Sequence, residues 1–597
     1  MFQTEQQTLA KKIRSFCAEN GLPEPGTITW TPIPFSGTWG MSTSFFQLAA
    51  VDARQLKERS GQAVNVPQYA QDIAQRIAVY LGTPVGFDRV EAIKGYLNVY
   101  FSPAEFAHRV VDAAIGQAKP FGSGLPKGER VMVEFSNPNT HKAFHVGHLR
   151  GAILGDSLCR ILEFAGYDVV RVNYIGDIGL HVIKWLWNYM KYHRGEKPSK
   201  DITRWMGDIY SEATDRLVEN PEFEAEVREL YARWDRRDPE VVDTWRETRQ
   251  WSLDGFTQIY EILDIRFERD YTNSEAEKPG QEIVQELIEK GIAVDERPSG
   301  GAVIVRLDEL LGLTKEKYRV MVILRSDNTA LYATEDLALA KIKFSEYDLA
   351  RSLYIVDVRQ SLHFQQVFKT LEISGYPWAT KCQHLPFELV TLPGNVILSS
   401  REGAVVLLED LLREAIERAM EVVRQKNPAL SNEQMQAVAV AVGIGALKYP
   451  MLSRESTKTV TFDWKTALDF NGQAAPYIQY AHVRCNSILR KAQAEGLTLS
   501  ALQSQFNYEL NPKEIQLIDQ ISRLPGEVQR AAEEYKPLII TNLAFEMARA
   551  FNDFYDACPV LKAEVEIRTG RLLLVMAAKQ AIANTLALLG ITAPEVM

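Results

Sequence analysis

The sequence predicts a multidomain α/β protein with a doubly wound parallel sheet at its centre. Three observations support this fold class. The chain has 597 residues, more than a single ordinary hydrophobic core holds. From position 130, an apolar strand, an amphipathic helix and a second apolar strand follow one another within about 45 residues. From 405 to 597 almost every segment has the apolar spacing of a helix, which predicts an all-α region there.

Residues 1–118 are expected to form a small α/β domain. They begin with an amphipathic helix pattern that has no apolar signal core, pass through a Pro- and Gly-rich stretch at 22–40, and reach a strand pattern in "GYLNVYFSP". The segment "AKPFGSGLPKGE" (118–129) is dense in Gly and Pro, which favours a linker. We therefore place the first domain boundary at 118.

The central region, 119–452, contains the parallel sheet. "RVMVEFS" and "YDVVRVNYIGD" are apolar strands on either side of the helix pattern "GHLRGAILGDSLCRILEFAG", which predicts a right-handed βαβ unit of the Rossmann type. Further strand-like pieces occur at 301–307, 318–325, 353–358 and 387–393. A charged, Trp-rich helical stretch at about 185–290 is expected to be an insertion in the sheet.

The C-terminal region, 453–597, is expected to be an all-α domain. Its most apolar run, at 572–591, contains Lys579, Gln580 and Asn584. A membrane-spanning helix rarely carries such side chains in its centre. The run is therefore interpreted as a buried helix, and no association with a membrane is expected.

The composition is that of a soluble globular protein, with 46% hydrophobic and 24% charged residues. The net charge of −10 gives no support to nucleic-acid binding, although a local basic face could still bind RNA. Five cysteines at irregular spacings, without a C-x-x-C pair, argue against a disulfide framework and a zinc site. This cysteine usage favours a reducing, cytoplasmic location.

The stretch "HKAFHVGHLRGAILGD" (141–156) holds three of the nine histidines. It follows the first strand of the βαβ unit and opens the helix, where parallel sheets bind ligands and helix N-termini favour phosphate. His145 and His148 are three residues apart, so both imidazoles can point the same way. Gly147 has no Cβ, which lets a flat ligand such as adenine approach the backbone. The alternative is a pair of surface histidines that cap the helix.

"HVGH" resembles the HIGH signature of class I aminoacyl-tRNA synthetases. The chain resembles the arginyl-tRNA synthetase family in particular, from about residue 95 to its end. The segments that carry this resemblance are "VEFSNPNTHKAFHVGHLR", "NYIGDIG", "LYATEDLA", "VDVRQSLHFQQVF", "FNGQAAPYIQYAHVR" and "LLGITAPEVM".

The resemblance implies that arginine and ATP, with Mg2+, form arginyl-adenylate and pyrophosphate, and that arginine then passes to the 3' end of its cognate tRNA. The arginine carboxylate is already ionised at pH 7, so the first step needs no general base. Catalysis is then a matter of positioning and of stabilising charge on the phosphates. His145 and His148 suit this role as hydrogen-bond donors to the triphosphate. The family generally binds tRNA before it activates arginine.

The second class I motif, K-M-S-K-S, corresponds to "ILSSREG" (397–403), which contains Ser399, Ser400 and Arg401 but no lysine. This is a departure from the family pattern. The resemblance implies that Lys142, three residues before His145, compensates for the missing lysine; the alternative is a solvated loop charge. Arg401 remains as the positive charge of a loop that closes over ATP.

Arginine selection needs a planar carboxylate that accepts two guanidinium N–H groups. Tyr332 and Asp336 are four residues apart, so on a helix they share one face and Glu335 should point elsewhere. The resemblance implies that Asp336 binds the guanidinium beside Tyr332; alone, Asp336 could equally be a helix N-terminal charge. The other implied contacts are Gln360 to arginine, Asn139, Ser136 and Glu134 to its α-amino and carboxylate end, and His363 on the adenosine side.

Asp177, in "IGDIG", either lines the ATP pocket or ends the second strand, and the sequence favours neither. The C-terminal region resembles the family's anticodon-binding domain, with Tyr477, Tyr480 and Arg484 as candidate tRNA contacts. Aromatic side chains interleaved with cations suit unpaired bases and phosphates, although packing of an amphipathic helix is the alternative. The N-terminal domain resembles the family's additional tRNA-contact domain.

Two other functions remain open at this point. One is a different enzyme on the same fold, either a nucleotidyltransferase or a synthetase for another amino acid. The large helical region disfavours the first, and the Tyr332–Asp336 pair disfavours an apolar amino acid. The other is a non-catalytic paralogue that binds tRNA or arginine, for which the lysine-free "LSSREG" is the sole support. We expect a monomer, as in many relatives.

Overall fold

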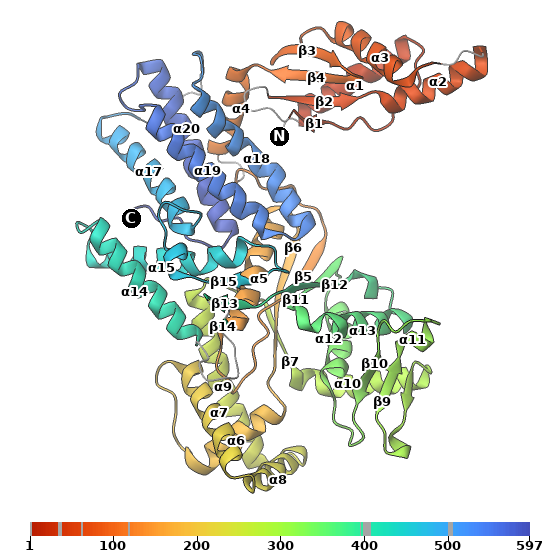
Figure 1. Ribbon diagram of the computed structural model, residues 1–597, viewed down its shortest axis with the longest axis vertical. Coiled ribbons are helices and arrows are strands. Elements are labelled where there is room, and N and C mark those ends of the chain that lie inside the picture. Colours follow the sequence, from red (N-terminus) through yellow and green to blue (C-terminus); the bar gives the residue numbers. More distant parts are fainter. Residues whose placement is uncertain are drawn as a thin grey trace.

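A computed structural model describes residues 3–33, 39–60, 64–116, 120–393, 396–397, 407–498 and 506–597. Figure 1 shows the N-terminal domain at one end of the molecule, next to helices of the C-terminal region, and a group of insertion helices at the other end. The parallel sheet lies between them. This arrangement places the sheet between the C-terminal helices and the insertion helices.

The central sheet has five strands, and each neighbouring pair is parallel. In spatial order they are β12 (Cys382–Phe387), β11 (Arg351–Asp357), β5 (Arg130–Glu134), β6 (Asp168–Ile175) and β7 (Arg269–Thr272). The direction of strand addition reverses between β5 and β11, which confirms the doubly wound prediction. Ligands of such sheets bind beyond the carboxyl ends of the strands at this reversal.

Helix α5 (Val146–Phe164) packs closely on the sheet because of one glycine. A Cβ on Gly155 would lie 2.1 Å from the Phe135 ring, so a larger residue would push the helix away from β5. The buried Val131, Met132 and Val133 of β5 give the continuous apolar run expected of a central parallel strand.

The helical insertion is shorter than the predicted range 185–290. It consists of α6 (Leu180–Tyr192), α7 (Ile202–Glu219), α8 (Phe223–Asp235) and α9 (Pro239–Ile262) around an aromatic core. After it, β7 returns to the parallel sheet and α10 (Asn273–Glu289) follows, so the predicted limit at 290 is wrong. The strand "RDYT" has only four residues, of which Tyr271 and Thr272 are buried, and is too short to give an apolar run.

The strand-like pieces at 301–307 and 318–325 are strands, but of a separate antiparallel sheet. Its members are β10 (Val320–Leu324), β9 (Val303–Arg306) and β8 (Ala293–Asp295), in that order. Val320 and Val322 face solvent whereas Met321 is buried, an alternation that antiparallel sheets tolerate. The short α11 (Leu307–Leu310), then α12 (Tyr332–Glu346) and α13 (Ser361–Ile373), complete this part.

The piece at 353–358 is confirmed as β11, while the piece at 387–393 is β13 (Val390–Leu392) of a small sheet with β14 (Val396–Ile397) and β15 (Val460–Thr461). In the N-terminal region the antiparallel sheet order is β1 (Thr31–Pro32), β2 (Gly40–Ser44), β4 (Tyr96–Phe101) and β3 (Phe87–Ile93). Its helices are α1 (Gln3–Glu19), α2 (Phe46–Ser60), α3 (Val66–Leu81) and α4 (Pro103–Ile115). The expected small α/β domain is present.

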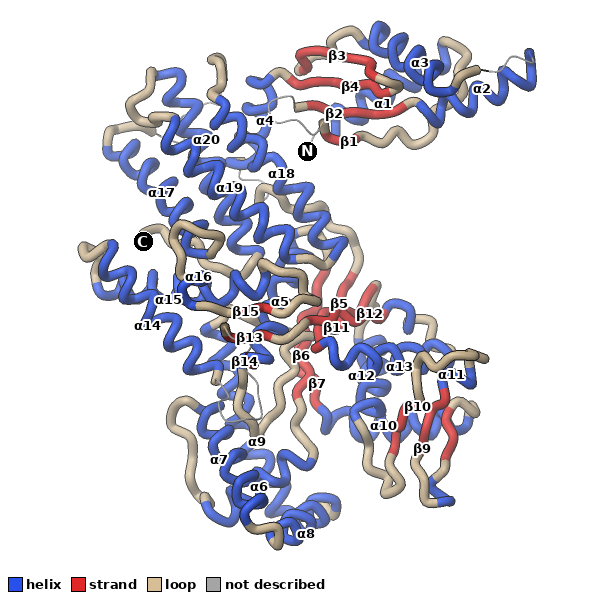
Figure 2. The backbone as a smooth tube through the Cα atoms, viewed as in Figure 1, coloured by secondary structure: helices blue, strands red, loops and turns tan. Residues whose placement is uncertain are grey.

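The part of the chain from 407 onward is helical, as Figure 2 shows by the helices that fill it. Its helices are α14 (Leu408–Lys426), α15 (Asn432–Leu452), α16 (Trp464–Ala467), α17 (Ala475–Ala494), α18 (Pro512–Glu534), α19 (Pro537–Ala557) and α20 (Val565–Leu588). Helices α15 and α20 are long and apolar enough to cross a membrane, but 72% and 61% of their most apolar windows are buried inside the protein. The prediction of a buried helix in the apolar run at 572–591 is thereby confirmed.

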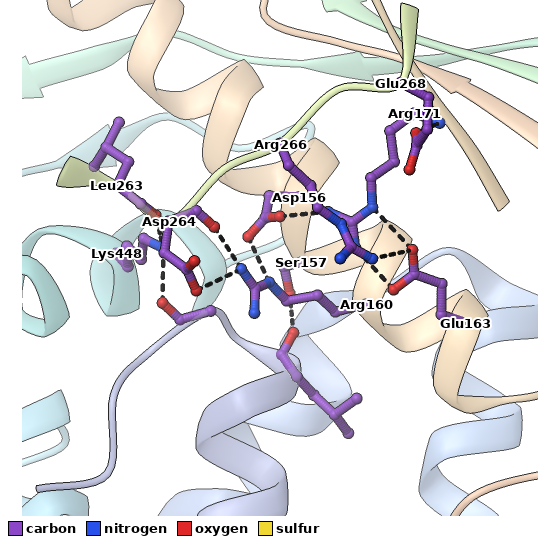
Figure 3. Close-up of polar contacts among 12 residues, drawn as sticks. Asp156, Ser157, Arg160, Glu163, Arg171, Leu263, Asp264, Arg266, Glu268 and Lys448 are labelled. Atoms are coloured by element: carbon purple, nitrogen blue, oxygen red, sulfur yellow. Dashed lines mark hydrogen bonds and ion pairs between the residues drawn. The ribbon is translucent and has the colours of Figure 1, made fainter. Parts of the chain in front are cut away.

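Polar contacts join α5 to the C-terminal helices (Figure 3). Ser157 donates to the Leu588 carbonyl over 2.9 Å. The buried Lys448 ammonium donates to the carbonyls of Leu263 and Gly590, over 2.5 and 2.7 Å. The helix that begins at the H-x-G-H motif is therefore bonded through its middle to the end of α20.

Candidate active site

The H-x-G-H motif opens α5 at the reversal of the sheet. His145 is the N-cap, and its Nδ1 accepts the Gly147 N–H over 3.1 Å. The His145 and His148 rings stack with centroids 4.0 Å apart and an angle of 26° between their planes. The two imidazoles thus share one side of the helix start, as their spacing predicts. With Nδ1 as an acceptor, Nε2 of His145 carries the proton and is the donor available to a ligand.

Both imidazoles are neutral at physiological pH. Burial, and next the nearby Lys142 ammonium, lower the pKa of His145 to about 4. Burial and the neighbouring His145 and Lys142 place the pKa of His148 well below its usual value, and its buried Nδ1 has no partner among the described residues. They can therefore act on a triphosphate as N–H donors, without added positive charge.

Lys142 and His141 lie just before the motif and have different surroundings. The Lys142 ammonium lies 5.0 Å from the centre of the Tyr210 ring of α7. Its charge also lowers the pKa of both motif histidines. The fully buried His141 bonds to Thr140 and Thr248, over 2.9 and 2.8 Å. The cluster thus combines two imidazoles at the helix start with one that fixes the loop inside the fold.

The lysine-free loop predicted to cover ATP, with Ser399, Ser400 and Arg401, lies outside the described residues. The chain that follows it is anchored directly on the motif. Leu407 forms a backbone bridge with His145, and the Leu408 N–H donates to the Phe144 carbonyl over 3.0 Å. Leu407, where the description resumes, therefore lies beside His145.

The segment after β5 has an unusual backbone. Ser136, Asn137 and His141 all have positive φ angles, of 77°, 52° and 59°. Non-glycine residues rarely adopt this conformation, and such residues cluster at ligand sites. Asn139 pairs with Gly176 in the backbone, and a Cβ on Gly176 would lie 2.1 Å from its side-chain oxygen. The absence of a Cβ at Gly176 leaves space for the Asn139 amide.

Two predicted arginine contacts are already engaged inside the fold. The carboxylate of Glu134 is buried and forms an ion pair with Lys343 of α12. Burial raises the pKa of Glu134 in spite of this cation. The Ser136 hydroxyl pairs with the Tyr260 hydroxyl of α9 over 2.7 Å. Neither group is free to receive arginine without rearranging, whereas Asn139 makes no such buried pair.

The predicted guanidinium site lies on the first turn of α12. Tyr332 is the first residue of the helix and is 68% exposed. Asp336 accepts a hydrogen bond from His363 Nε2 over 2.5 Å, which places His363 beside the arginine site, whereas an adenosine-side position was expected. Burial alone would lower the pKa of His363, but this bond and the Asp336 charge raise it. Gln360, exposed at the end of η2 (Val358–Gln360), precedes His363 by one turn.

Asp177 lies two residues after the end of β6 and joins two other elements. Its carboxylate accepts Arg249 Nε over 2.8 Å and the Ser274 hydroxyl over 2.6 Å, and its carbonyl accepts the Trp245 indole N–H. Asp177 is fully buried. The structure thus favours the structural alternative for this residue, because both carboxylate oxygens serve α9 and α10.

Sequence reasoning missed Glu335, together with Tyr174 and Asn273 around it. Glu335 is buried and accepts the Tyr174 hydroxyl over 3.2 Å and an Asn273 N–H. Its local pattern resembles that of any helix N-terminal acid. No signal in the sequence could have shown which of the adjacent Glu335 and Asp336 turns inward, because the partners are far away along the chain.

The candidate tRNA contacts lie together on α17. The Arg484 guanidinium carbon lies 4.6 Å from the centre of the Tyr480 ring and 5.0 Å from that of the Tyr555 ring, and Arg484 donates to Asn552 over 2.9 Å. Tyr477 packs on Phe545, with ring centroids 5.5 Å apart. All three predicted side chains are half-buried, so they form a rigid aromatic and cationic surface.

Comparison with known proteins matches the chain to two family models. Residues 110–464 match the catalytic domain of class I (R) tRNA synthetases, and residues 478–597 match the DALR anticodon-binding domain. The first match covers more than half of the chain.

Individual proteins show the same relationship. The chain is 36% identical over 514 residues to the arginine–tRNA ligase of Clostridium perfringens, with 86% of this chain and 88% of the relative covered. It is 33% identical over 528 residues to that of Clostridioides difficile, covering 88% and 90%. The arginyl-tRNA synthetase structure from Thermus thermophilus matches with a TM-score of 0.77 and 27% identity over 99% of this chain and 100% of that one.

Proposed function

This chain belongs to the class I tRNA synthetases of the arginine (R) family, and from this premise we infer that it is an arginine–tRNA ligase. It activates arginine with ATP to arginyl-adenylate and pyrophosphate. It then transfers arginine to the 3' end of the cognate tRNA. The competing activities of a nucleotidyltransferase or a non-catalytic paralogue find no support in relatives that match over most of the chain.

The arginine site carries this assignment at the level of geometry. Glu335 and Asp336 stand side by side at the start of α12, and the Asp336 charge acts on the buried Glu134 at the end of β5. The reversal of the sheet therefore combines a phosphate-binding helix start with two neighbouring carboxylates. Arginine suits this combination, because its guanidinium matches the two carboxylates and its own carboxylate reacts with ATP at the helix start.

For the activation step, we assign His145 and His148 as donors to the triphosphate, with Gly147 beneath the adenine. Lys142 supplies positive charge next to them, and Arg401, Ser399 and Ser400 belong to the covering loop, which remains a prediction. Loss of one such donor costs about 2.7–4 kcal/mol of barrier. ATP is proposed to enter as its Mg2+ complex, so that the metal is part of the substrate.

For arginine, we assign Asp336 to the guanidinium, with Tyr332 and Gln360 beside it, and Asn139 to the α-amino end. Since His363 is bonded to Asp336, its predicted place on the adenosine side requires that arginine displace it. Glu134 and Ser136 contact the substrate in this proposal only if their bonds to Lys343 and Tyr260 break. Otherwise they position the loop after β5.

For tRNA, we assign the α17 surface of Tyr477, Tyr480 and Arg484, together with the N-terminal domain. The proposed division of the chain is 1–118 for tRNA contact, 119–452 for catalysis and 453–597 for the anticodon. We further propose a monomer in the cytoplasm. All five cysteines are free thiols, which supports a reducing compartment.

Aminoacylation of total tRNA with each of the twenty amino acids, ATP and Mg2+ tests the function. We expect arginine alone to be charged, and Asp336→Ala to abolish charging. Tight tRNA binding without charging by any amino acid would refute the enzyme and support a non-catalytic paralogue. Charging with a second amino acid would refute the assignment of the guanidinium site.

A further inference from the structure

Glu335 was expected to point away from the site, but its side chain turns inward. It is 8% exposed, although the neighbouring Tyr332 is largely in solvent. The Tyr174 hydroxyl of β6 donates to Glu335 over 3.2 Å, and Asn273 of α10 donates to the same oxygen. Three elements that are distant in sequence thus converge on one carboxylate, and both donors are neutral.

The charge around Glu335 is unbalanced. Its nearest charged neighbour is the Asp336 carboxylate, and Asp177 adds a second negative charge. In the described part of the chain, no lysine or arginine forms an ion pair with Glu335, whereas three other acids of the sheet and its helices each pair with a cation or a histidine. These pairs are Arg249 with Asp177, His363 with Asp336, and Lys343 with Glu134. A buried carboxylate without a cation is costly, so one positive charge is missing here.

We propose that Glu335 is the second carboxylate of the arginine site and receives the guanidinium together with Asp336. This inference rests on the proposed function and adds a specificity residue to it. A guanidinium presents five N–H donors in one plane and is weakly hydrated, so it can meet two adjacent carboxylates. It supplies the missing charge. A neutral side chain such as that of citrulline does not, which explains how the site distinguishes arginine from a polar isostere.

The proposal predicts that arginine binding releases a proton. Burial, and next the Asp336 charge, raise the pKa of Glu335 to about 7 in spite of its hydrogen bonds to Asn273 and Tyr174. A bound guanidinium favours the ionised form, so this pKa falls and the proton leaves. The proton release is largest near pH 6–7 and disappears above about pH 8, so the KM for arginine falls as pH rises from 6 to 8. His363 adds a second source, because arginine removes it from Asp336.

Glu335→Gln tests the proposal, because it keeps the shape and removes the charge. Glu346→Gln is the matched control, since Glu346 lies at the other end of α12 and also accepts a tyrosine hydroxyl, that of Tyr271, over 2.6 Å. The first measurement is the KM for arginine in aminoacylation. The second is calorimetric titration of arginine into the enzyme–tRNA complex without ATP, at pH 6.5, in two buffers with different ionisation enthalpies.

We expect Glu335→Gln to raise the KM for arginine at least about thirtyfold, with the KM for ATP unchanged, because one partner of a buried charge pair is gone. The released proton assigned to Glu335 should also disappear, while His363→Gln should retain it. Glu346→Gln should stay within about twofold of the wild type in both measurements.

An arginine KM and proton release within about twofold of the wild type in folded Glu335→Gln would overturn the proposal and leave Glu335 as a structural acid. If Glu335→Gln does not fold, calorimetric titration of arginine into His363→Gln replaces it. Absence of proton release in that variant would also overturn the proposal. Wild-type enzyme that charges no arginine would instead refute the proposed function, which separates the two failures.

Discussion

Lys343→Met should destabilise the catalytic sheet by about 3–5 kcal/mol, because it leaves a buried carboxylate without its cation. The side chains of Lys343 and Glu134 are 0% and 3% exposed, and their ion pair ties α12 to the end of β5. After the substitution, Glu134 retains one neutral donor, the Asn137 amide at 3.4 Å. Water cannot reach this carboxylate to replace the lost ammonium.

The penalty should depend on pH with a definite sign. Burial already raises the pKa of Glu134, and removal of Lys343 raises it further. A raised folded-state pKa means that the folded protein holds a proton that the unfolded chain releases, so stability is lost as pH rises through the folded-state value. The penalty should therefore be larger at pH 8 than at pH 5. The double variant Glu134→Gln with Lys343→Met should recover most of the loss, since neither charge remains.

Native-state hydrogen exchange of peptides from β5 and α12 measures the opening free energy of this part rather than of the whole multidomain chain. Lys341→Met is the control on the same helix. Its ammonium is 49% exposed and pairs with Glu286 over 2.9 Å, so its loss should cost less than about 1 kcal/mol. Equal effects of the two lysine substitutions, or a Lys343→Met penalty that does not change between pH 5 and 8, would refute the reasoning.

Three further predictions concern catalysis and tRNA. His148→Asn should lower the rate of arginine activation about 100- to 1000-fold in tRNA-dependent pyrophosphate exchange, with the KM for arginine unchanged; a changed KM alone would contradict its role at the triphosphate. Because the pKa of His145 is lowered to about 4, kcat at saturating arginine should stay constant from pH 8 to about 5.5, and a decline centred near 6.5 would show that an ordinary histidine titrates. Arg484→Met should raise the KM for tRNA about tenfold and leave that for arginine unaltered, because its guanidinium contacts the rings of Tyr480 and Tyr555 in the predicted tRNA surface; an unchanged tRNA KM would mean a purely structural contact.

Local features of the chain could be predicted because neighbouring residues carry them. The H-x-G-H spacing brings His145 and His148 onto one side of a helix start whatever surrounds it, and the structure shows their stacked rings. The buried run at 572–591 could be recognised for the same reason, since its polar residues are too many for a membrane span. Strand β7 was not predicted, because it has only four residues and no apolar pattern of its own. It is a strand because it pairs with β6.

The sequence alone determined the doubly wound class, the helix start that carries the H-x-G-H motif and the family of the chain, because these depend on residues within one or two elements. Tertiary structure alone decided which acid of the arginine site turns inward. Glu335 is held by Asn273 and Tyr174, 62 and 161 residues away, and its pKa depends on burial that no local pattern records. It also decided that Asp177, Glu134 and Ser136 are engaged inside the fold, since each is paired with a partner from a distant helix. Charge and solvation are properties of the assembled surroundings, and those exist only once the chain has folded.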